Sequence, residues 1–170
     1  MTNIKLTYDY TLNSIKVVNE SVDKINTKLG LVLTLSGILV NFGKDLPGYN
    51  LVITKGLTYL CLSCYLLKLG AYILIIAAIS FALWGLSPAI GGKIILPAQL
   101  LEDEWNLAEE ENYLTALVNY LENETLLVLN KFRDVKAGRL ALAIRSISSA
   151  VILLGLDEII TISIPVLQKL

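Results

Sequence analysis

An almost uncharged run from Leu57 to Leu86 constrains this chain more than any other feature of its sequence. Lys68 is the only charged residue among these 30 residues. The hydrocarbon core of a bilayer is ~30 Å thick, and about 20 helical residues cross it. The uncharged stretch after Lys68, residues 69 to 88, meets this length by itself. The run therefore predicts a transmembrane helix over residues 57–86, and the rest of the chain must be placed relative to a membrane.

Two further apolar runs predict two more spans, over residues 29–46 and 139–160. The third is expected to end at Asp157 and Glu158, since Asp157 lies 18 residues beyond Arg139, which is ~27 Å along a helix. Charged residues are 17% of the chain, against about a quarter in soluble domains. The expected fold is an all-α membrane protein, with residues 1–170 forming a single membrane domain that contains three transmembrane helices.

The polar remainder predicts a helical stalk in the cytoplasm. Residues 3–28 carry apolar side chains at three- and four-residue spacing, which predicts an amphipathic helix that continues into the first span. A helix lying on the membrane surface is the alternative for this segment. Residues 98–136 predict further helices, one starting at a capping box formed by Asn106 and Glu109. Lysine and arginine are concentrated before the first span and between the second and third. The positive-inside rule therefore places the N-terminus and residues 88–139 in the cytoplasm.

Small and polar side chains form a stripe along each predicted span. In lipid, helices approach one another closely along such stripes, and a pore-lining face would show the same pattern. We interpret the stripes as helix interfaces, with a pore lining as the alternative. The first contains Gly30, Thr34, Gly37 and Asn41; the second contains Cys61, Cys64, Lys68, Ala71, Ile75, Ala78, Ala82 and Gly85; the third contains Gly138, Ala141, Arg145, Ser148, Ile152 and Gly155.

Two basic residues lie inside the predicted spans, where an ionisable side chain is a functional candidate by default. Arg145 lies six residues beyond Arg139. The alternative is that its side chain snorkels ~9 Å back to the interface. Lys68 lies 16 residues from Trp84, or ~24 Å along the helix, so it should reach the headgroups of the opposite interface. Either residue could line a pathway through the membrane.

The sequence does not favour catalysis, a cofactor or a metal site. The chain has no histidine, and it shows no nucleophile motif, P-loop or dinucleotide fingerprint. The Cys61-x-x-Cys64 pair is similar to a redox or metal motif. Without histidine or a second cysteine pair, however, it does not predict a zinc site. The net charge of −1 argues against nucleic acid as a partner.

Several segments resemble the Pycsar-effector family of bacterial membrane proteins. These segments are ESVDKINTKLGLVLTLSGILVNF, ALWGLSP, LPAQLLEDEWNLAEEE and NKFRDVKAGRLALAI, and they cover roughly residues 18 to 156. The SLATT membrane effectors have a similar layout. The resemblance implies an antiphage effector that forms a homo-oligomer in the bacterial inner membrane and breaks its permeability barrier. It also implies a trigger, either a cyclic nucleotide or a sensor protein. The chain departs from the pattern because it shows no separate domain for a cyclic nucleotide.

The sequence therefore leaves two candidate functions. The first is a conditional membrane effector that oligomerises and opens a pore, as indicated by the three stripes, by Arg145 and by the resemblance. The second is a passive membrane scaffold or subunit whose stalk docks a partner protein. The scaffold requires only the stripes and the acidic helix that follows the second span.

Overall fold

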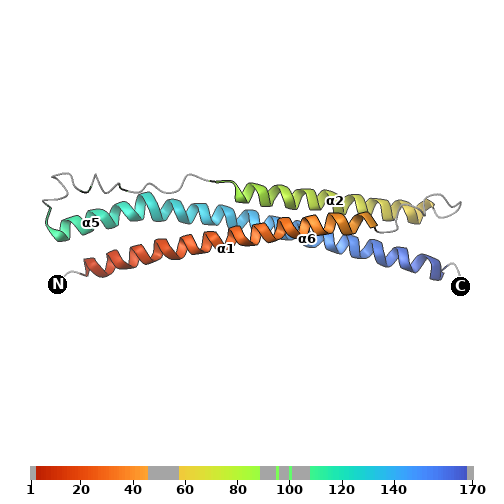
Figure 1. Cartoon of the computed structure of the whole chain (residues 1–170), viewed down its shortest axis with the longest axis horizontal. Helices are drawn as coiled ribbons and strands as arrows, with labels where there is room; N and C mark the ends of the chain where they lie inside the picture. Colours follow the sequence, from red (N-terminus) through yellow and green to blue (C-terminus); the bar gives the residue numbers. More distant parts are fainter. Residues whose placement is uncertain (1–2, 46–57, 89–94, 96–99, 101–107, 168–170) are drawn as a thin grey trace. The chain divides into compact units, whose positions relative to one another are not determined.

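The computed structural model describes residues 3–45, 58–88, 95, 100 and 108–167. They form α1 (Ile4–Asp45), α2 (Thr58–Leu86), α5 (Glu110–Tyr120), the π-helical segment η2 (Leu121–Leu126) and α6 (Leu127–Leu167), as Figure 1 shows. No strand occurs among these residues. Three helical stretches are long and apolar enough to cross a membrane, namely Ile4–Lys44, Cys64–Leu86 and Glu110–Ser163. The predicted all-α, membrane-type fold is confirmed.

Two of the observed helices, α1 and α6, continue through boundaries between the predicted segments. Helix α1 contains both the amphipathic segment and the first apolar run without a break. Helix α6 begins at Leu127 and ends at Leu167, so it contains the whole of the predicted third span, residues 139–160. Adjacent carboxylates do not interrupt backbone hydrogen bonding, and Asp157 and Glu158 therefore lie inside a helix instead of ending it.

The predicted capping box does not mark the start of the third long helical stretch, Glu110–Ser163. Glu109 has extended backbone angles (φ −57°, ψ 142°), and it is the N-cap of α5 without a side-chain hydrogen bond. Glu109 therefore cannot be the third helical residue of a helix capped by Asn106, which lies outside the described residues. The helix instead begins at Glu110, where Glu110 and Glu111 place negative charge in its first turn.

The chain divides into two compact units. The first consists of Met1–Asn26 and Ser87–Ala137, and the second of Thr27–Leu86 and Gly138–Leu170. Helices α1 and α6 contribute residues to both units. The division falls within two residues of the boundaries that hydropathy predicts between stalk and spans. The change from polar to apolar sequence thus falls close to the boundary between the two compact units.

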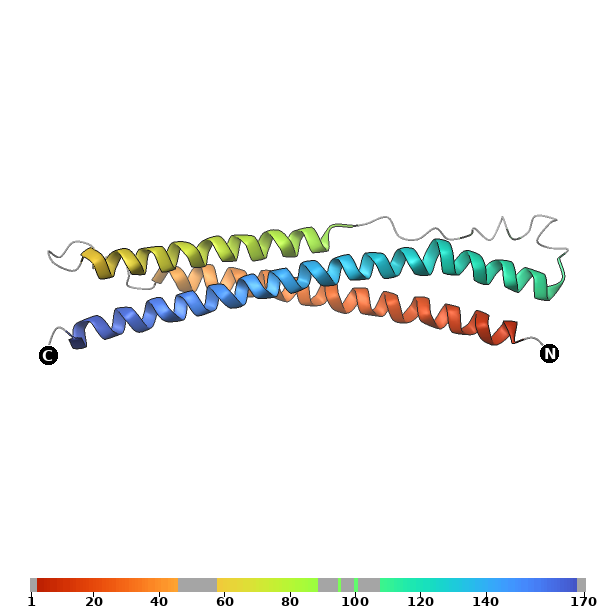
Figure 2. The ribbon, with the colours of Figure 1, turned by 180° about the vertical axis from the view of Figure 1, so that it is seen from behind.

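The second unit is built on buried seams that follow the spacing of a coiled coil. Figures 1 and 2 show α2 beside the C-terminal parts of α1 and α6 from both sides. Buried residues on each helix recur three, four or seven positions apart, as they do where helices pack along a shared seam. They are Leu29, Val32, Ser36 and Gly43 of α1, Cys64, Ala71, Ile75, Ala78, Ala82 and Gly85 of α2, and Leu140, Ala143, Ile147, Ala150, Leu154, Asp157 and Thr161 of α6.

Two glycines allow α1 and α2 to approach each other closely in antiparallel orientation. A β-carbon at Gly85 would lie 2.8 Å from Cδ1 of Leu29, and one at Gly43 would lie 2.8 Å from Oη of Tyr72. Both distances are shorter than non-bonded carbon contacts allow. Any larger residue at Gly85 would therefore displace the leucine that fills the gap between the two helices.

The first unit joins the N-terminal part of α1 to α5, η2 and the start of α6. Val18, Val22 and Val118 are among its buried side chains. Lys136 is also buried, and its Nζ donates a hydrogen bond to Oδ1 of Asn26 at 2.8 Å. Its ammonium group lies 4.8 Å from the centre of the Phe132 ring, within the range of a cation–π contact. The buried lysine is thus satisfied by groups of its own unit.

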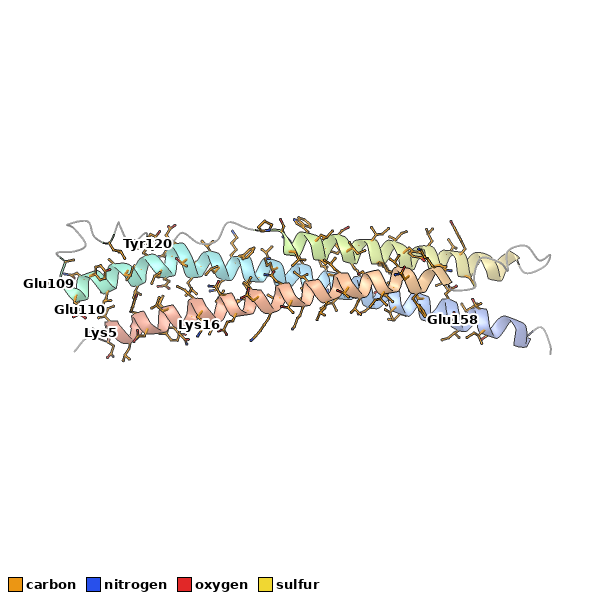
Figure 3. All side chains as sticks on the ribbon, in the orientation of Figure 1. Lys5, Lys16, Glu109, Glu110, Tyr120 and Glu158 are labelled. Carbon is orange, nitrogen blue, oxygen red and sulfur yellow. The ribbon has the colours of Figure 1, made fainter. Side chains whose placement is uncertain are left out.

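An exposed ion pair links the ends of α1 and α5 in the first unit. Nζ of Lys5 lies 2.7 Å from Oε1 of Glu110, and Figure 3 shows the two residues next to each other. The hydrogen bond and the negative charge of Glu110 raise the pKa of Lys5 above its ordinary value of 10.5. Because solvent surrounds both side chains, the pair adds little to the free energy of unfolding.

Candidate functional site

The stripe predicted along the second span forms the buried seam of α2. Ala71, Ala78 and Ala82 have no exposed surface. Cys64 is buried, whereas the side chain of Cys61 lies outside the described residues. Lys68 is half-buried and interacts within the chain. These residues therefore pack α2 against the chain's own helices.

The stripe predicted along the first span faces away from the described helices. Thr34, Gly37 and Asn41 are exposed, and Gly30 is half-buried. No atom would lie within 4 Å of a β-carbon at Gly30 or Gly37, beyond the helix itself. At about 100° per residue, the stripe lies ~150° around α1 from the buried seam. The described part of the chain therefore does not use this stripe to pack its own helices.

The stripe predicted along the third span faces outward in the same way. All six of its members, Gly138, Ala141, Arg145, Ser148, Ile152 and Gly155, are exposed. A β-carbon at either Gly138 or Gly155 would meet open space. The seam of α6 lies nearly opposite, again ~150° away. Below, the exposed residues Thr34, Gly37 and Asn41 of α1, and these six residues of α6, are called the outward stripes.

Arg145 is the charged member of the α6 outward stripe. Among the described residues, it has no hydrogen bond or ion pair. Few groups inside the spans could pair with its charge. The next carboxylate after Arg145 on α6 is that of Asp157, ~18 Å further along the helix. The guanidinium group is therefore available to water, lipid or a second protein chain.

Arg139 has a different environment, one turn and a half before Arg145. Its Nη1 donates a hydrogen bond to the backbone oxygen of Trp84 at 2.7 Å. Its guanidinium carbon lies 4.4 Å from the centre of the Trp84 ring. This contact joins the last turn of α2 to the part of α6 that precedes Arg145. Sequence reasoning missed this contact, although it placed Trp84 at an interface.

Asp157, which is expected to bound the third crossing, lies in the buried seam of α6. Its side chain is 1% exposed, and α6 continues beyond it to Leu167. Asp157 lies seven residues after Ala150 and three after Leu154, so it continues the buried seam. This spacing was the signal in the sequence that could have placed it in the core.

The arrangement provides surfaces for protein or lipid contacts. Within the described part of the chain, no three histidine, cysteine, aspartate or glutamate side chains gather closely enough to hold a metal ion. The polar groups on the apolar helices include the outward stripes and the buried carboxyl group of Asp157. No protein family, curated protein or solved structure matches the chain.

Proposed function

We propose that this chain is a bacterial inner-membrane effector that assembles with copies of itself and breaks the permeability barrier of the membrane. The observation that carries the proposal is the position of Arg145 on an outward stripe. On insertion scales, an arginine at the centre of a spanning helix costs ~2.5–3.5 kcal/mol. A second copy, together with water between the copies, would provide the polar surroundings that lipid lacks.

The two outward stripes suit this assembly because they combine small side chains with polar ones. Glycine and alanine let neighbouring backbones approach closely, and hydroxyl and amide groups form hydrogen bonds between helices in lipid. Thr34 and Asn41 on α1 and Ser148 on α6 supply such groups. Other faces of these helices expose large apolar residues that suit lipid contact, including Leu31, Leu35, Ile38, Phe42, Val151 and Ile159.

The antiphage role and the trigger in this proposal come from the resemblance of several sequence segments to Pycsar effectors. In this scheme, a cyclic nucleotide or a sensor protein acts on the first unit, which lies in the cytoplasm. Assembly of the second unit then opens the membrane. The bilayer and further copies of the chain are the structural partners, and neither a cofactor nor nucleic acid is required.

A passive scaffold is the second candidate function, and exposed apolar residues of the first unit favour it. Leu6, Tyr10 and Val17 are 68%, 73% and 56% exposed. Their spacings of four and seven residues place them on one face of α1. Such a face could dock a partner helix. A scaffold of this kind needs no change in membrane permeability.

Membrane potential in cells separates the two functions. Strong expression of the chain in a bacterial host, with a potential-sensitive dye and with or without phage, should depolarise the membrane if the chain is an effector. Fractionation confirms that the chain is inserted. An unchanged potential in both conditions, with the chain in the membrane fraction, would contradict the effector and favour the scaffold.

The proposed topology places the N-terminus in the cytoplasm and the C-terminus outside, after three crossings. A reporter that is active only outside the cytoplasm should be active when fused after Leu170 and inactive when fused before Met1. A cytoplasmic reporter fused at the same positions provides the matched control and should show the reverse pattern. If the cytoplasmic reporter is active at the C-terminus, the chain crosses the membrane one time fewer than proposed or has the opposite orientation.

A further inference from the structure

Four exposed charged residues of the first unit lie on the sides of α1 and α6 that face away from its core. They are Glu20 and Lys24 of α1, and Lys131 and Asp134 of α6. At about 100° per residue, the two residues of α1 lie ~160° around the helix from the buried Val22. Those of α6 lie ~140–160° from the buried Lys136. Below, they are called the α1 pair and the α6 pair.

The two pairs are accessible to a second protein chain. Within the described part of the molecule, Glu20, Lys24 and Lys131 form no hydrogen bond or ion pair. Oδ1 of Asp134 accepts two hydrogen bonds from the adjacent Arg133, at 3.0 and 2.8 Å. The side chain of Asp134 is nevertheless 67% exposed. All four charges can therefore form contacts outside their own copy.

Two contacts fix how α1 is aligned with the stretch formed by α5, η2 and α6 in the first unit. Lys5 pairs with Glu110 near one end of the unit, and Asn26 accepts a hydrogen bond from Lys136 near the other end. The order of these contacts shows that α1 and the facing stretch run in the same direction, as can be followed in Figure 1.

This alignment places the two charge pairs at the same level along the unit. Lys24 lies two residues before Asn26, and Asp134 lies two residues before Lys136. The remaining members of the α1 pair and the α6 pair precede the same contact by six and five residues. At a rise of 1.5 Å per residue, these two members lie within ~2 Å of the same level. Each level thus carries one positive and one negative charge.

We propose that the α1 pair of one copy binds the α6 pair of a neighbouring copy. Glu20 then meets the neighbouring copy's Lys131. Lys24 meets the neighbouring copy's Asp134 one turn further along. The proposal rests on the assembly in the proposed function, because copies inserted in one membrane in the same orientation present these residues at the same height. It concerns contacts of the first unit and leaves those of the second unit to the outward stripes.

Charge favours this contact over the symmetric alternatives. Two α1 helices in parallel contact along this face would bring Glu20 against Glu20 and Lys24 against Lys24. Two α6 helices would likewise oppose Lys131 with Lys131 and Asp134 with Asp134. Contact of α1 with α6 instead joins opposite charges at both levels, and like charges disfavour the other pairings. An antiparallel contact of two α1 helices would require copies inserted in opposite orientations. A contact between two different surfaces is the type that builds rings.

Disulfide crosslinking of full-length chains in native membranes tests this contact. In a background with Cys61 and Cys64 replaced by alanine, one chain carries Glu20→Cys and a second chain with a different tag carries Lys131→Cys. Oxidation should give dimers that contain both tags, and few dimers that contain one tag twice. Asn19→Cys in place of Glu20→Cys is the matched control. Asn19 is exposed but lies ~100° around α1 from Glu20, so the mixed dimers should be lost.

Exchanging the charges gives a second reading that needs no cysteine. Glu20→Lys and Lys131→Glu should each weaken association by about fivefold, the equivalent of ~1 kcal/mol for an exposed pair. Energy transfer between labelled chains in detergent micelles measures this association. A chain with both substitutions should associate like the parent, because opposite charges meet again. Added salt should weaken association of the parent, since it screens exposed charges.

The proposed contact is overturned if mixed dimers form no more readily with Glu20→Cys than with Asn19→Cys, or if the double exchange fails to restore association. Membrane potential separates these outcomes from failure of the proposed function. Mixed dimers in a membrane whose potential is unchanged would support the contact and contradict the effector. Depolarisation without mixed dimers would support the effector and contradict the contact.

Discussion

Replacing Arg145 by leucine should abolish the membrane depolarisation that strong expression of the chain causes. The guanidinium group is exposed on a helix that is apolar on both sides of it. If assembled copies surround water at this position, the charge keeps the pathway hydrated, and leucine would let it close. Insertion should be unaffected or improved, because leucine removes the cost of an arginine in the span, which is ~2.5–3.5 kcal/mol at a helix centre and less near the interface. Dye fluorescence and membrane fractionation measure the two effects separately.

Arg145→Lys should retain part of the depolarisation. Lysine keeps the charge but lacks the planar group that forms several hydrogen bonds at once. Ile144→Leu is the matched control, since Ile144 is exposed next to Arg145 and carries no charge; it should behave like the parent. If Arg145→Leu depolarises the membrane as strongly as the parent does, Arg145 is only an interfacial anchor. The proposed pore would then depend on the sequence resemblance alone.

Two leucine substitutions should separate assembly from folding. Gly37→Leu should weaken the association of copies, and Ala78→Leu should weaken the fold of each copy. Gly37 has open space around it, so leucine there should leave the chain folded. It would separate helices of neighbouring copies, and a weakening of association by ~1 kcal/mol is expected, typical of interhelical contacts in membranes. Ala78 is fully buried in the seam of α2, so leucine there should destabilise the fold by ~1–3 kcal/mol through overpacking.

Energy transfer between labelled chains, diluted in detergent micelles, measures association, and thermal unfolding of the same samples measures stability. Ser80→Leu is a control on α2, because Ser80 is exposed and lies outside the seam; it should leave the melting temperature close to that of the parent. Unchanged association of Gly37→Leu would exclude the α1 stripe as an interface. A normal melting temperature for Ala78→Leu would contradict the packing of α2.

Hydropathy predicted most of the fold. The three spans follow from the cost of burying charge in lipid, and the long uncharged run around Leu69–Leu86 allowed few alternatives. The buried side of α2 was also predictable, because its small residues form the only stripe on an otherwise large and apolar helix. Ala71, Ala78 and Ala82 accordingly lie in its core-facing seam.

The same reasoning could not predict which side of α1 and which side of α6 is buried. Each carries two stripes of equal period on nearly opposite sides, one small and polar and the other made of residues such as Leu29 or Leu154. Periodicity alone cannot say which one packs inward. In the structure the larger apolar residues fill the space between the chain's own helices, and Gly37 and Arg145 face outward. The charge of Asp157 suggested the edge of a crossing and gave no sign of its burial, which its spacing from Leu154 could have indicated.

Disulfide crosslinking between copies tests the central claim, that the outward stripe of α6 contacts a second chain. In a background with Cys61 and Cys64 replaced by alanine, Ser148→Cys places a thiol on the stripe, and Ala150→Cys places one in the buried seam. Oxidation in native membranes should yield crosslinked dimers of the Ser148→Cys chain and few of the Ala150→Cys chain. Absence of dimers with Ser148→Cys, or equal yields at both positions, would contradict the claim.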